Sequence, residues 1–254
     1  DMKVSVITTS YNSGHTIKDT LMSVATQDYA NIEHLIIDGG SKDETMNVVS
    51  KFGHVAVAIS EKDGGIFHVM NKGLQLCTGD VICFLNSDDW YISPTVISSV
   101  VNCLQNSHCN VAYGDLQYVQ QFNPERIVRT WKSGRFRRKN LYYGWMPPHP
   151  AFFAKKEVYE EVGFFNTELN SAADYELMLR NAGIRALEKE LELGIVGRDA
   201  AGPGGDIVRG PALVVQAVAD GKRALYRQIE MPLDQAYAEA TEVMIGHFMD
   251  PTRI

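Results

Sequence analysis

Phe84-Leu85-Asn86-Ser87-Asp88-Asp89-Trp90 is the stretch of this sequence from which the rest of the fold can be worked out. An apolar run from Val81 to Leu85 leads into it, and such a run is typical of a fully buried strand. In open α/β sheets, ligands bind beyond the carboxyl ends of the strands. Carboxylate oxygens at that place suit Mg²⁺ or Mn²⁺ shared with a diphosphate. The alternative is that Asp88 and Asp89 only cap the helix expected after Pro94.

The same order of strand, polar loop and helix is predicted three times before this stretch. Strands are expected over 3–9, 32–37 and 55–60, because each run is rich in β-forming residues. Polar or acidic residues follow each predicted strand, and they are Thr9 to Tyr11, Asp38, Asp63 and, after the fourth strand, Asp88. Any one of these acids could be a helix cap. Four at successive strand ends indicate a parallel sheet whose loops meet at one ligand site.

Helices are expected between these strands. Apolar residues at helical spacing begin at Ile17, and Ser41 with Glu44 fits a capping box for a helix that runs to Lys51. The sequence contains neither the GxGxxG of dinucleotide-binding folds nor the GxxxxGK[ST] of a P-loop. The ligand is therefore expected to be held mainly by side chains and a metal ion.

Length and composition narrow the class of protein. At 254 residues the chain can form one large domain or two modest ones, and its net charge of −7 argues against a general nucleic-acid binder. No apolar run approaches the roughly 20 residues needed to span a bilayer, and no secretion signal is recognised, so a cytoplasmic protein is expected. The cysteines form no CxxC pair and are expected to be small apolar residues in a reduced compartment: Cys77, Cys83, Cys103 and Cys109.

The segment Arg126–Lys139 carries seven basic residues and no acidic one. It follows two predicted strand segments, Val111–Asp115 and Leu116–Gln121, so it could be the solvated rim of a hairpin. It could equally meet an anionic membrane surface or the diphosphate of a lipid-linked acceptor, at about 1 kcal/mol per cation near anionic lipid. Aromatic residues that suit stacking on sugar rings lie within and after it: Trp131, Phe136, Tyr142, Tyr143 and Trp145.

A carboxylate opens the last helix of this part of the chain. After a predicted strand over Ala151–Ala154 and a helix over Lys156–Val162, a further helix is expected with Asp174 in its first turn. The helix dipole favours a negative charge there, which suits a base that stays ionised at neutral pH.

Taken together, these residues resemble family 2 glycosyltransferases of GT-A fold, over about residues 2–182. The chain is most similar to bacterial enzymes that build surface polysaccharide by adding sugars to a lipid-linked acceptor. Five segments in the right order carry the resemblance: Val4 to Asn12, Ile37 to Asp43, Ser60 to Ile66, Asn86 to Asp89, and Ala173-Asp174.

The resemblance implies an α/β fold with a Rossmann-like, mostly parallel sheet flanked by helices. Residues 1–182 would form the GT-A domain, with a nucleotide half over about 1–115 and an acceptor half over about 116–182. The residues expected to bind the nucleotide sugar are Thr9, Tyr11, Asp38, Asp63, Gly65, Asn86 and Ser87. Asp88 would hold Mn²⁺ or Mg²⁺, and Asp174 would be the general base. His149 and Asp89 would lie on the acceptor side.

Two positions depart from the family pattern. Asn86 stands where the first Asp of the DxD motif is usual, and this weakens metal binding although an amide can still contact sugar or ribose. Ala173 stands where Glu commonly precedes the base, so Asp174 is the only local candidate for the base.

The function that follows is transfer of a sugar from a nucleotide-diphosphate sugar to an acceptor hydroxyl, with inversion, because one base and no second nucleophilic carboxylate are found in that segment. The partners expected are the donor and a saccharide or lipid-linked acceptor in polysaccharide biosynthesis, at the inner face of the membrane. Nucleic acid is not expected as a partner.

The alternative function is a non-catalytic nucleotide-sugar-binding module with a compromised acceptor site. A sugar-nucleotide pyrophosphorylase would need a basic glycine-rich loop, which Ser10–Gly14 does not provide.

The tail, residues 183–254, departs from the family pattern. It contains no Ser, Trp or Cys, and an alanine-rich helical appendage is expected, with helices over Leu187–Leu193, Ala212–Tyr226 and Leu233–Met249. Ala200 to Ala224 resembles the closing flavin-site segment of glutamate-synthase-type oxidoreductases, and Met231 to Asp250 resembles the C-terminal helices of enoyl-CoA hydratases. Both are fragments, so neither a flavin site nor a CoA site is expected to work.

Overall fold

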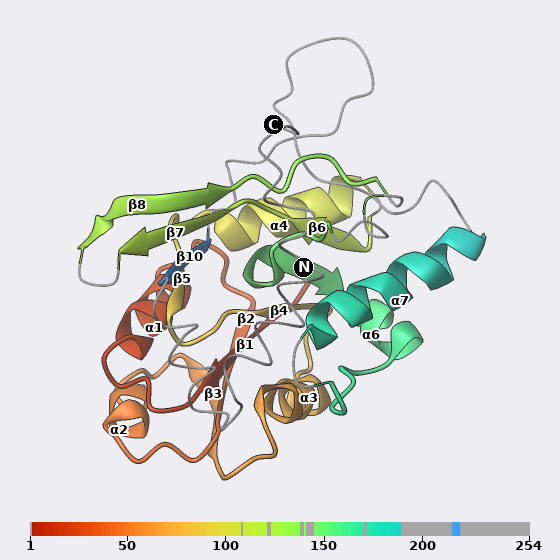
Figure 1. The fold of residues 1–254 in the computed structure, drawn as a ribbon. Coiled ribbons are helices and arrows are strands. Elements are labelled where there is room, and N and C mark those ends of the chain that lie inside the picture. Colours follow the sequence, from red (N-terminus) through yellow and green to blue (C-terminus); the bar gives the residue numbers. More distant parts are fainter. Residues whose placement is uncertain are drawn as a thin grey trace.

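A computed structural model describes residues 2–107, 109–120, 123–137, 140, 145–169, 172–188 and 215–218. Its centre is a six-stranded sheet in the order β3-β2-β1-β4-β9-β6 (Figure 1). The strands are β1 (Val4–Ser10), β2 (Ile32–Asp38), β3 (Val55–Ser60), β4 (Val81–Phe84), β6 (Val111–Tyr113) and β9 (Phe152–Lys155). The first four are parallel, as predicted, while β9 runs antiparallel to β4 and to β6.

The register brings the strand ends to one edge. Ser10 lies beside Asp38, and Asp38 lies beside Ser60, so β1, β2 and β3 end together. On the other side of β1, the backbone of the 85–87 segment continues along the strand, since the Ser87 N–H donates to the Thr9 carbonyl at 3.2 Å. The loops predicted to share an edge therefore do so.

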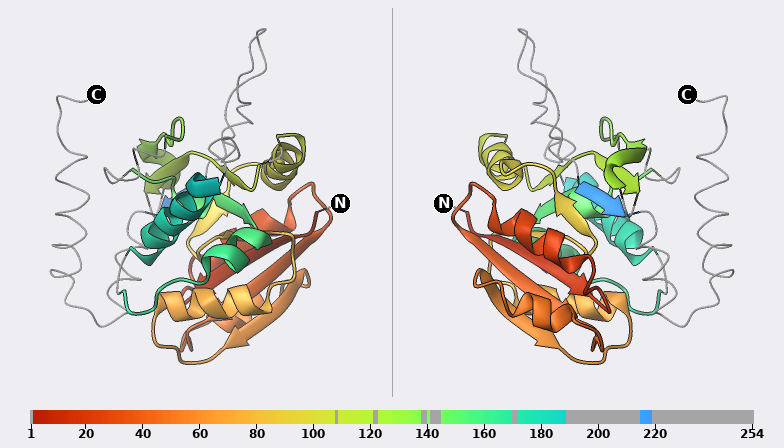
Figure 2. Two further views of the ribbon diagram at one scale, coloured as in Figure 1. Left: turned by 90° about the vertical axis from the view of Figure 1, so that its right-hand side faces the viewer. Right: turned by 90° about the vertical axis from the view of Figure 1, so that its left-hand side faces the viewer.

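Helices cover both faces of the sheet (Figure 2). Alternate strand residues point to opposite faces, so one strand supplies two cores. Ile7, Ile37 and Phe84 pack in one apolar cluster with α3 (Ile66–Leu76), α6 (Lys156–Val162) and α7 (Ala173–Glu188). On the opposite face pack α1 (Ile17–Ala25), α2 (Thr45–Val49) and α4 (Val96–Asn106). The result is the three-layer α/β arrangement predicted from the sequence.

Gly73 allows α3 to lie close against the sheet. A methyl group at this position would lie 2.4 Å from Cγ2 of Ile7 in β1 and 3.5 Å from Cγ1 of Ile37 in β2. The first distance is shorter than any van der Waals contact, so only a residue without a side chain fits. Gly53, by contrast, has nothing within 4 Å of such a methyl group.

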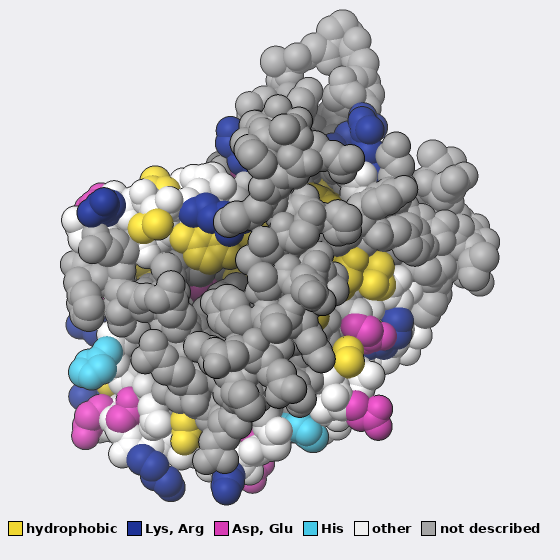
Figure 3. Space-filling model, in the orientation of Figure 1, with side chains coloured by type: hydrophobic (Ala, Val, Ile, Leu, Met, Phe, Trp, Pro, Cys, Tyr) yellow, Lys and Arg dark blue, Asp and Glu magenta, His cyan; other side chains and the backbone are white. Residues whose placement is uncertain are grey.

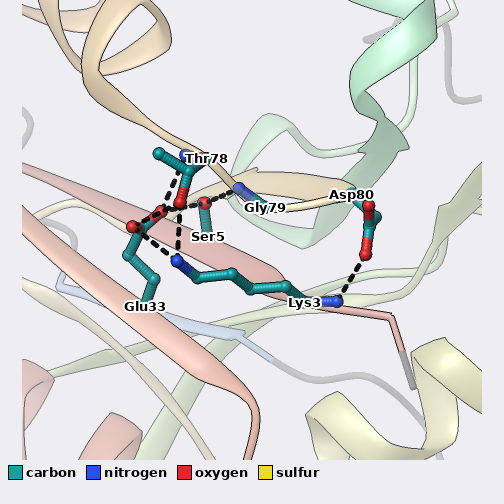
Figure 4. Close-up of polar contacts among 6 residues, drawn as sticks. All are labelled: Lys3, Ser5, Glu33, Thr78, Gly79 and Asp80. Atoms are coloured by element: carbon teal, nitrogen blue, oxygen red, sulfur yellow. Dashed lines mark hydrogen bonds and ion pairs between the residues drawn. The ribbon is translucent and has the colours of Figure 1, made fainter.

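A polar cluster ties the opposite edge of the sheet together (Figure 4). The Glu33 carboxylate of β2 accepts hydrogen bonds from Lys3 Nζ at 2.9 Å, from Ser5 Oγ at 2.6 Å and from the Thr78 backbone N–H at 2.8 Å. Gly79 donates its N–H to Ser5 Oγ, and a methyl group on it would lie 2.6 Å from that oxygen. The connection from α3 to β4 is thereby fixed to β1 and β2.

A second sheet has the order β5-β10-β7-β8 and contains β5 (Asp89–Tyr91), β7 (Leu116–Gln120), β8 (Asn123–Trp131) and β10 (Val215–Val218). β7 and β8 form an antiparallel hairpin in which Leu116 pairs with Trp131. β10 pairs with β5 and with β7, so these four tail residues form a strand within the range predicted as a helix, Ala212–Tyr226. α7 runs to Glu188, past the expected domain boundary at 182. Of the predicted helix Leu187–Leu193, only residues 187 and 188 are described, as the end of α7, and the remaining tail predictions lie outside the described residues.

The capping box predicted from Ser41 and Glu44 does not form. α2 begins at Thr45, and its N-cap residue Glu44 makes no side-chain hydrogen bond to the helix. Asp43 instead accepts a hydrogen bond from the Thr45 N–H at 3.0 Å, and the Ser41 hydroxyl donates to Asp38. The Ser41 side chain is therefore used to hold the strand-end loop.

All four cysteines are free thiols, and Cys103 on α4 is the only one that is not buried. Burial raises the pKa of the Cys83 thiol to about 12 and that of Cys77 to about 11. Within the described part of the chain, no helix combines the length and apolar character needed to cross a membrane.

Candidate active site

Three of the predicted nucleotide-sugar residues meet at the carboxyl edge of the sheet. Thr9 is the residue before the last of β1, and its hydroxyl donates to the Asn86 side-chain oxygen at 3.1 Å. Ser87 lies beside them and shares a 2.7 Å hydrogen bond between its hydroxyl and that of Ser13. Sequence reasoning did not single out Ser13, because nothing in its local pattern shows that it faces a loop 74 residues further on.

The Asn86 amide holds its own loop. Its oxygen accepts from Thr9, and its nitrogen donates to the Asp89 carboxylate at 3.1 Å. The Thr20 hydroxyl of α1 also binds this loop, donating a 2.7 Å hydrogen bond to the Asp89 carbonyl. A neutral amide suits this position, since a carboxylate could not donate the bond to Asp89.

The two neighbouring acids of this loop differ in exposure. Asp89 is 1% exposed and begins β5, whereas Asp88 is only partly buried. Asp88 is therefore the carboxylate of this pair that a ligand can reach more easily. A role for Asp89 toward the acceptor stays a prediction.

Asp38 is completely buried and organises the ends of three strands. Its carboxylate accepts five hydrogen bonds, from the hydroxyls of Ser10, Ser41 and Ser60 and from the backbone N–H groups of Gly40 and Ser41. Gly40 has φ +85°, a conformation that favours glycine. The carboxylate thus fixes the loop next to it, and direct contact between Asp38 and a nucleotide stays a prediction.

Tyr11, Asp63 and Gly65 lie in the loops that follow β1 and β3. The Tyr11 ring lies against Gly39, where a methyl group would be 3.4 Å from Cδ2 of the ring. Asp63 forms an ion pair with Lys72 of α3 at 2.5 Å, and Lys72 also contacts Glu61 at 2.6 Å. Gly65 precedes α3 with φ +133°. These residues follow strands that end at the same edge of the sheet, and contact between any of them and a nucleotide stays a prediction.

Asp174 lies in the first turn of α7, as predicted, and is partly buried. Ala173, the residue before it, is completely buried in the apolar cluster that also contains Phe84, the last residue of β4. A larger residue at 173 would have to displace part of this cluster. The helix that carries Asp174 therefore begins in the same cluster in which the strand leading to Asp88 ends.

His149 opens a short 3₁₀ turn (His149–Ala151) and is 9% exposed. Its ring stacks on Phe84 with the ring centroids 5.3 Å apart and meets the edge of Phe165 at 5.7 Å. The segment expected to face the acceptor is thus anchored at the end of β4. Contact between His149 and an acceptor stays a prediction.

The residues at this edge fit a divalent cation that shares its ligands with a substrate. No group of three or more His, Cys, Asp or Glu side chains that could hold a metal ion occurs in the described residues. Mg²⁺ in particular is usually bound by one or two carboxylates together with substrate phosphates, so a single carboxylate at this edge is compatible with such a site, and Asp88 as its ligand stays a prediction.

Comparison with known proteins identifies the family. The family model described as glycosyl transferase family 2 matches residues 5–163. The chain belongs to this family. An uncharacterized glycosyltransferase of Mycobacterium tuberculosis is 34% identical to it over 185 residues, which cover 70% of this chain and 68% of that relative.

Solved structures share the fold of this glycosyltransferase. S. aureus TarS 1–349 in complex with UDP-GlcNAc superposes with a TM-score of 0.64 at 18% identity, covering 96% of this chain and 73% of that one. The mannosyltransferase PcManGT from Pyrobaculum calidifontis, in complex with GDP-Man and Mn²⁺, gives a TM-score of 0.58 at 18% identity, covering 95% of this chain and 64% of that one. The GT-A fold predicted from the sequence is confirmed.

Proposed function

We propose that this family 2 glycosyltransferase transfers a sugar from a nucleotide-diphosphate sugar to an acceptor hydroxyl with inversion of the anomeric centre. The observation that carries the proposal is the meeting of Thr9, Asn86 and Ser87 at the carboxyl edge of the sheet, directly before Asp88. Both structural neighbours described above are complexes with nucleotide-diphosphate sugars, which supports the same class of donor here.

Asp174 is the proposed general base. It would take the proton of the acceptor hydroxyl while that oxygen forms a bond to the anomeric carbon. The bond from this carbon to the donor diphosphate breaks on the opposite face, and the nucleotide diphosphate leaves. A positioned base of this kind contributes about 10²- to 10⁴-fold to the rate.

Asp88 would hold Mn²⁺ or Mg²⁺ together with the donor diphosphate. When bound, the cation supplies charge neutralisation for the leaving diphosphate. Asn86 is not proposed as a metal ligand, because its side-chain amide is hydrogen-bonded to Thr9 and to Asp89. Asp88 alone would then provide the carboxylate ligand, so affinity for the metal depends on the donor being present.

The acceptor is proposed to be a lipid-linked saccharide of surface polysaccharide synthesis, met at the inner face of the membrane. Support comes from β8, where Arg126 and Arg129 flank Ile127 and Val128, which are 51% and 60% exposed. Basic and hydrophobic side chains are interleaved on the surface over β7 and β8 (Figure 3). Cations beside exposed apolar groups suit an anionic lipid surface. Of the basic segment, Arg138 and Lys139 lie outside the described residues.

A panel of UDP-, GDP- and dTDP-sugars, each with and without Mn²⁺, tests the proposal. Turnover of one donor, measured as release of the nucleotide diphosphate on addition of an acceptor, is the expected result. Thermal protection by a nucleotide diphosphate without turnover of any donor would instead favour a non-catalytic binding module. Absence of both protection and turnover would reject a nucleotide-sugar site.

A further inference from the structure

Asn71 of α3 forms a reciprocal pair of hydrogen bonds with the backbone of Phe165. Its side-chain nitrogen donates to the Phe165 carbonyl at 2.9 Å, and the Phe165 N–H donates to its side-chain oxygen at 2.9 Å. The pair connects residues 94 positions apart in the chain. Phe165 is 3% exposed and Asn71 is partly buried, so these bonds are shielded from water and stronger than surface bonds.

Arg180 of α7 binds the same turn from the other side. Its guanidinium donates to the carbonyls of Val162 and, at 2.7 Å, of Phe164. Glu176, one helical turn earlier, orients the guanidinium through contacts of 2.7 and 2.9 Å. The turn 162–165 is therefore bonded to α3 by one side chain and to α7 by another.

The Phe165 ring extends this connection to the donor side of the site. It meets the edge of Phe84, at the end of β4, with the centroids 5.3 Å apart. It also stacks on Phe67 of α3 at 5.9 Å and meets His149 at 5.7 Å. Phe84 is followed, two residues on, by Asn86 and the loop that carries Asp88. The turn thus contacts elements of both halves of the predicted domain.

We infer that Asn71 is a positioning residue for sugar transfer, acting through Phe165 and the 162–165 turn to set the place of α7 and so of Asp174. The inference rests on the proposed function, in which Asp174 is the base. Both polar atoms of the Asn71 amide are used by Phe165, so its effect is exerted through the backbone. A base must lie within hydrogen-bond reach of its proton, and a displacement of about 1 Å can cost about 100-fold in rate.

The test compares Asn71→Ala with Gln75→Ala, an exposed position on the same helix. The quantity to measure is the ratio of sugar transfer to donor hydrolysis, together with the Kd of the nucleotide diphosphate. This ratio does not depend on the fraction of folded enzyme, so a residue that only stabilises the fold leaves it unchanged. Asn71→Ala is expected to lower the ratio about tenfold or more, with the Kd within about twofold, and Gln75→Ala should change neither. A ratio within about twofold of wild type in Asn71→Ala would overturn the inference.

Asn71→Asp covers the case in which the alanine variant does not fold. It keeps the shape of the side chain and the bond from the Phe165 N–H, but it removes the donor to the Phe165 carbonyl. Hydrogen exchange of the 163–166 and 173–176 amides should accelerate in this variant and not in Gln75→Ala, and unchanged exchange would refute the link. This readout needs no activity, so it separates failure of the inference from failure of the proposed function. If the proposed function itself were wrong, the wild-type protein would turn over no donor.

A double-mutant cycle gives an independent check on the shared turn. Arg180→Ala should reproduce the loss of transfer, because it releases the same turn from α7. If both side chains act through this one turn, the combined Asn71→Ala/Arg180→Ala variant loses less than the product of the single effects. Multiplicative losses would show that the two residues act separately and would contradict the inference.

Discussion

Thr9 and Asn86 are joined by a 3.1 Å hydrogen bond between side chains 77 residues apart, and this bond closes the loop that leads to Asp88. The same amide donates to Asp89 at 3.1 Å. Asn86 therefore accepts a hydrogen bond from Thr9 and donates one to Asp89. An aspartate at position 86 could accept the first bond but could not donate the second. The departure from the usual DxD pattern has a structural reason in this chain.

Asn86→Asp is expected to destabilise the metal-free protein. The change removes the hydrogen bond to Asp89 and sets two carboxylates about 3 Å apart, at a cost of roughly 1–3 kcal/mol. Mn²⁺ with a nucleotide diphosphate should recover more of the melting temperature in the variant than in wild type, since a cation offsets the added charge. The isosteric Gln75→Glu at an exposed site of α3 is the control. Equal melting temperatures without metal would mean that the amide does not hold the loop.

Asp174→Asn should abolish most of the transfer while the donor still binds. Loss of a general base predicts a fall in kcat of about 10²- to 10⁴-fold, with the Kd of the nucleotide diphosphate unchanged. Glu157→Gln is a matched control, because Glu157 is also an acid in the first turn of a helix, in α6. Steady-state kinetics and nucleotide titration measure both quantities. If turnover by the asparagine variant matched wild type, another group would have to be the base.

Glu33 should make stability depend on acidity. Burial opposes ionisation, but hydrogen bonds from Lys3, Ser5 and Thr78 outweigh it and lower the pKa of Glu33 to about 2 from an ordinary 4.5. Because the folded-state pKa is the lower one, the carboxylate stabilises the fold fully above pH about 4.5, and this contribution is lost as the pH falls toward 2.

Glu33→Gln is the variant that measures this contribution. The gap in unfolding free energy between wild type and variant should be widest at neutral pH, roughly 2–3 kcal/mol, and should narrow between pH 5 and 2. Buried His34, whose pKa burial lowers to about 3, is present in both proteins and cancels in the comparison. Denaturant unfolding at several pH values provides the measurement, and a gap that stays constant over this range would contradict the assignment.

Gly73→Ala should destabilise the domain through contact with Ile7. A methyl group 2.4 Å from Ile7 Cγ2 forces α3 away from the sheet, and overpacking of this kind typically costs about 1–3 kcal/mol. Gly53→Ala, where the added methyl group meets nothing within 4 Å, is the control and should be close to neutral. Thermal unfolding of both variants tests the prediction, which fails if the two are equally stable.

The double variant Arg126→Ser/Val128→Ser should bind vesicles that contain anionic lipid more weakly than wild type does. Both residues are exposed on β8, whereas the guanidinium of Arg129 lies over the rings of Tyr118 and Trp131, at 5.6 and 6.0 Å. The cost of losing one cation is about 1 kcal/mol, or roughly fivefold in affinity. Vesicle co-sedimentation at two salt concentrations measures it, with neutral vesicles as the control. Equal sedimentation of wild type with both kinds of vesicle would remove the support for membrane contact.

The nucleotide half of the fold could be predicted from the sequence because each unit of it is local. Every parallel strand is a short apolar run that ends in a polar loop, and this order alone places Thr9, Asp38 and Ser87 at one edge. What the order of residues did not reveal is which way a side chain points within a loop. Asp88 and Asp89 are adjacent acids, yet only the packing of β5 decides that Asp89 is the buried one.

Contacts between distant segments were the other part that the sequence did not reveal. Nothing in the sequence singled out Asn71, since no periodic pattern links it to a backbone group at Phe165. The strand β10 also lay within a predicted helix, because Val215–Val218 forms a strand only through pairing with β5 and β7. Helical propensity is a weak prior, and such pairing overrides it.

The arrangement of the thiols makes this protein convenient to label. Three of the four thiols are buried in the folded protein, namely Cys77, Cys83 and Cys109. Cys103 is therefore the one thiol that a maleimide can reach in the folded state. A dye or spin label attached there would sit on α4, on the face of the sheet opposite α7. Paired with a second probe introduced on α7, it would report whether the distance to the helix that carries Asp174 changes when donor and acceptor are added, without any cysteine having to be removed first.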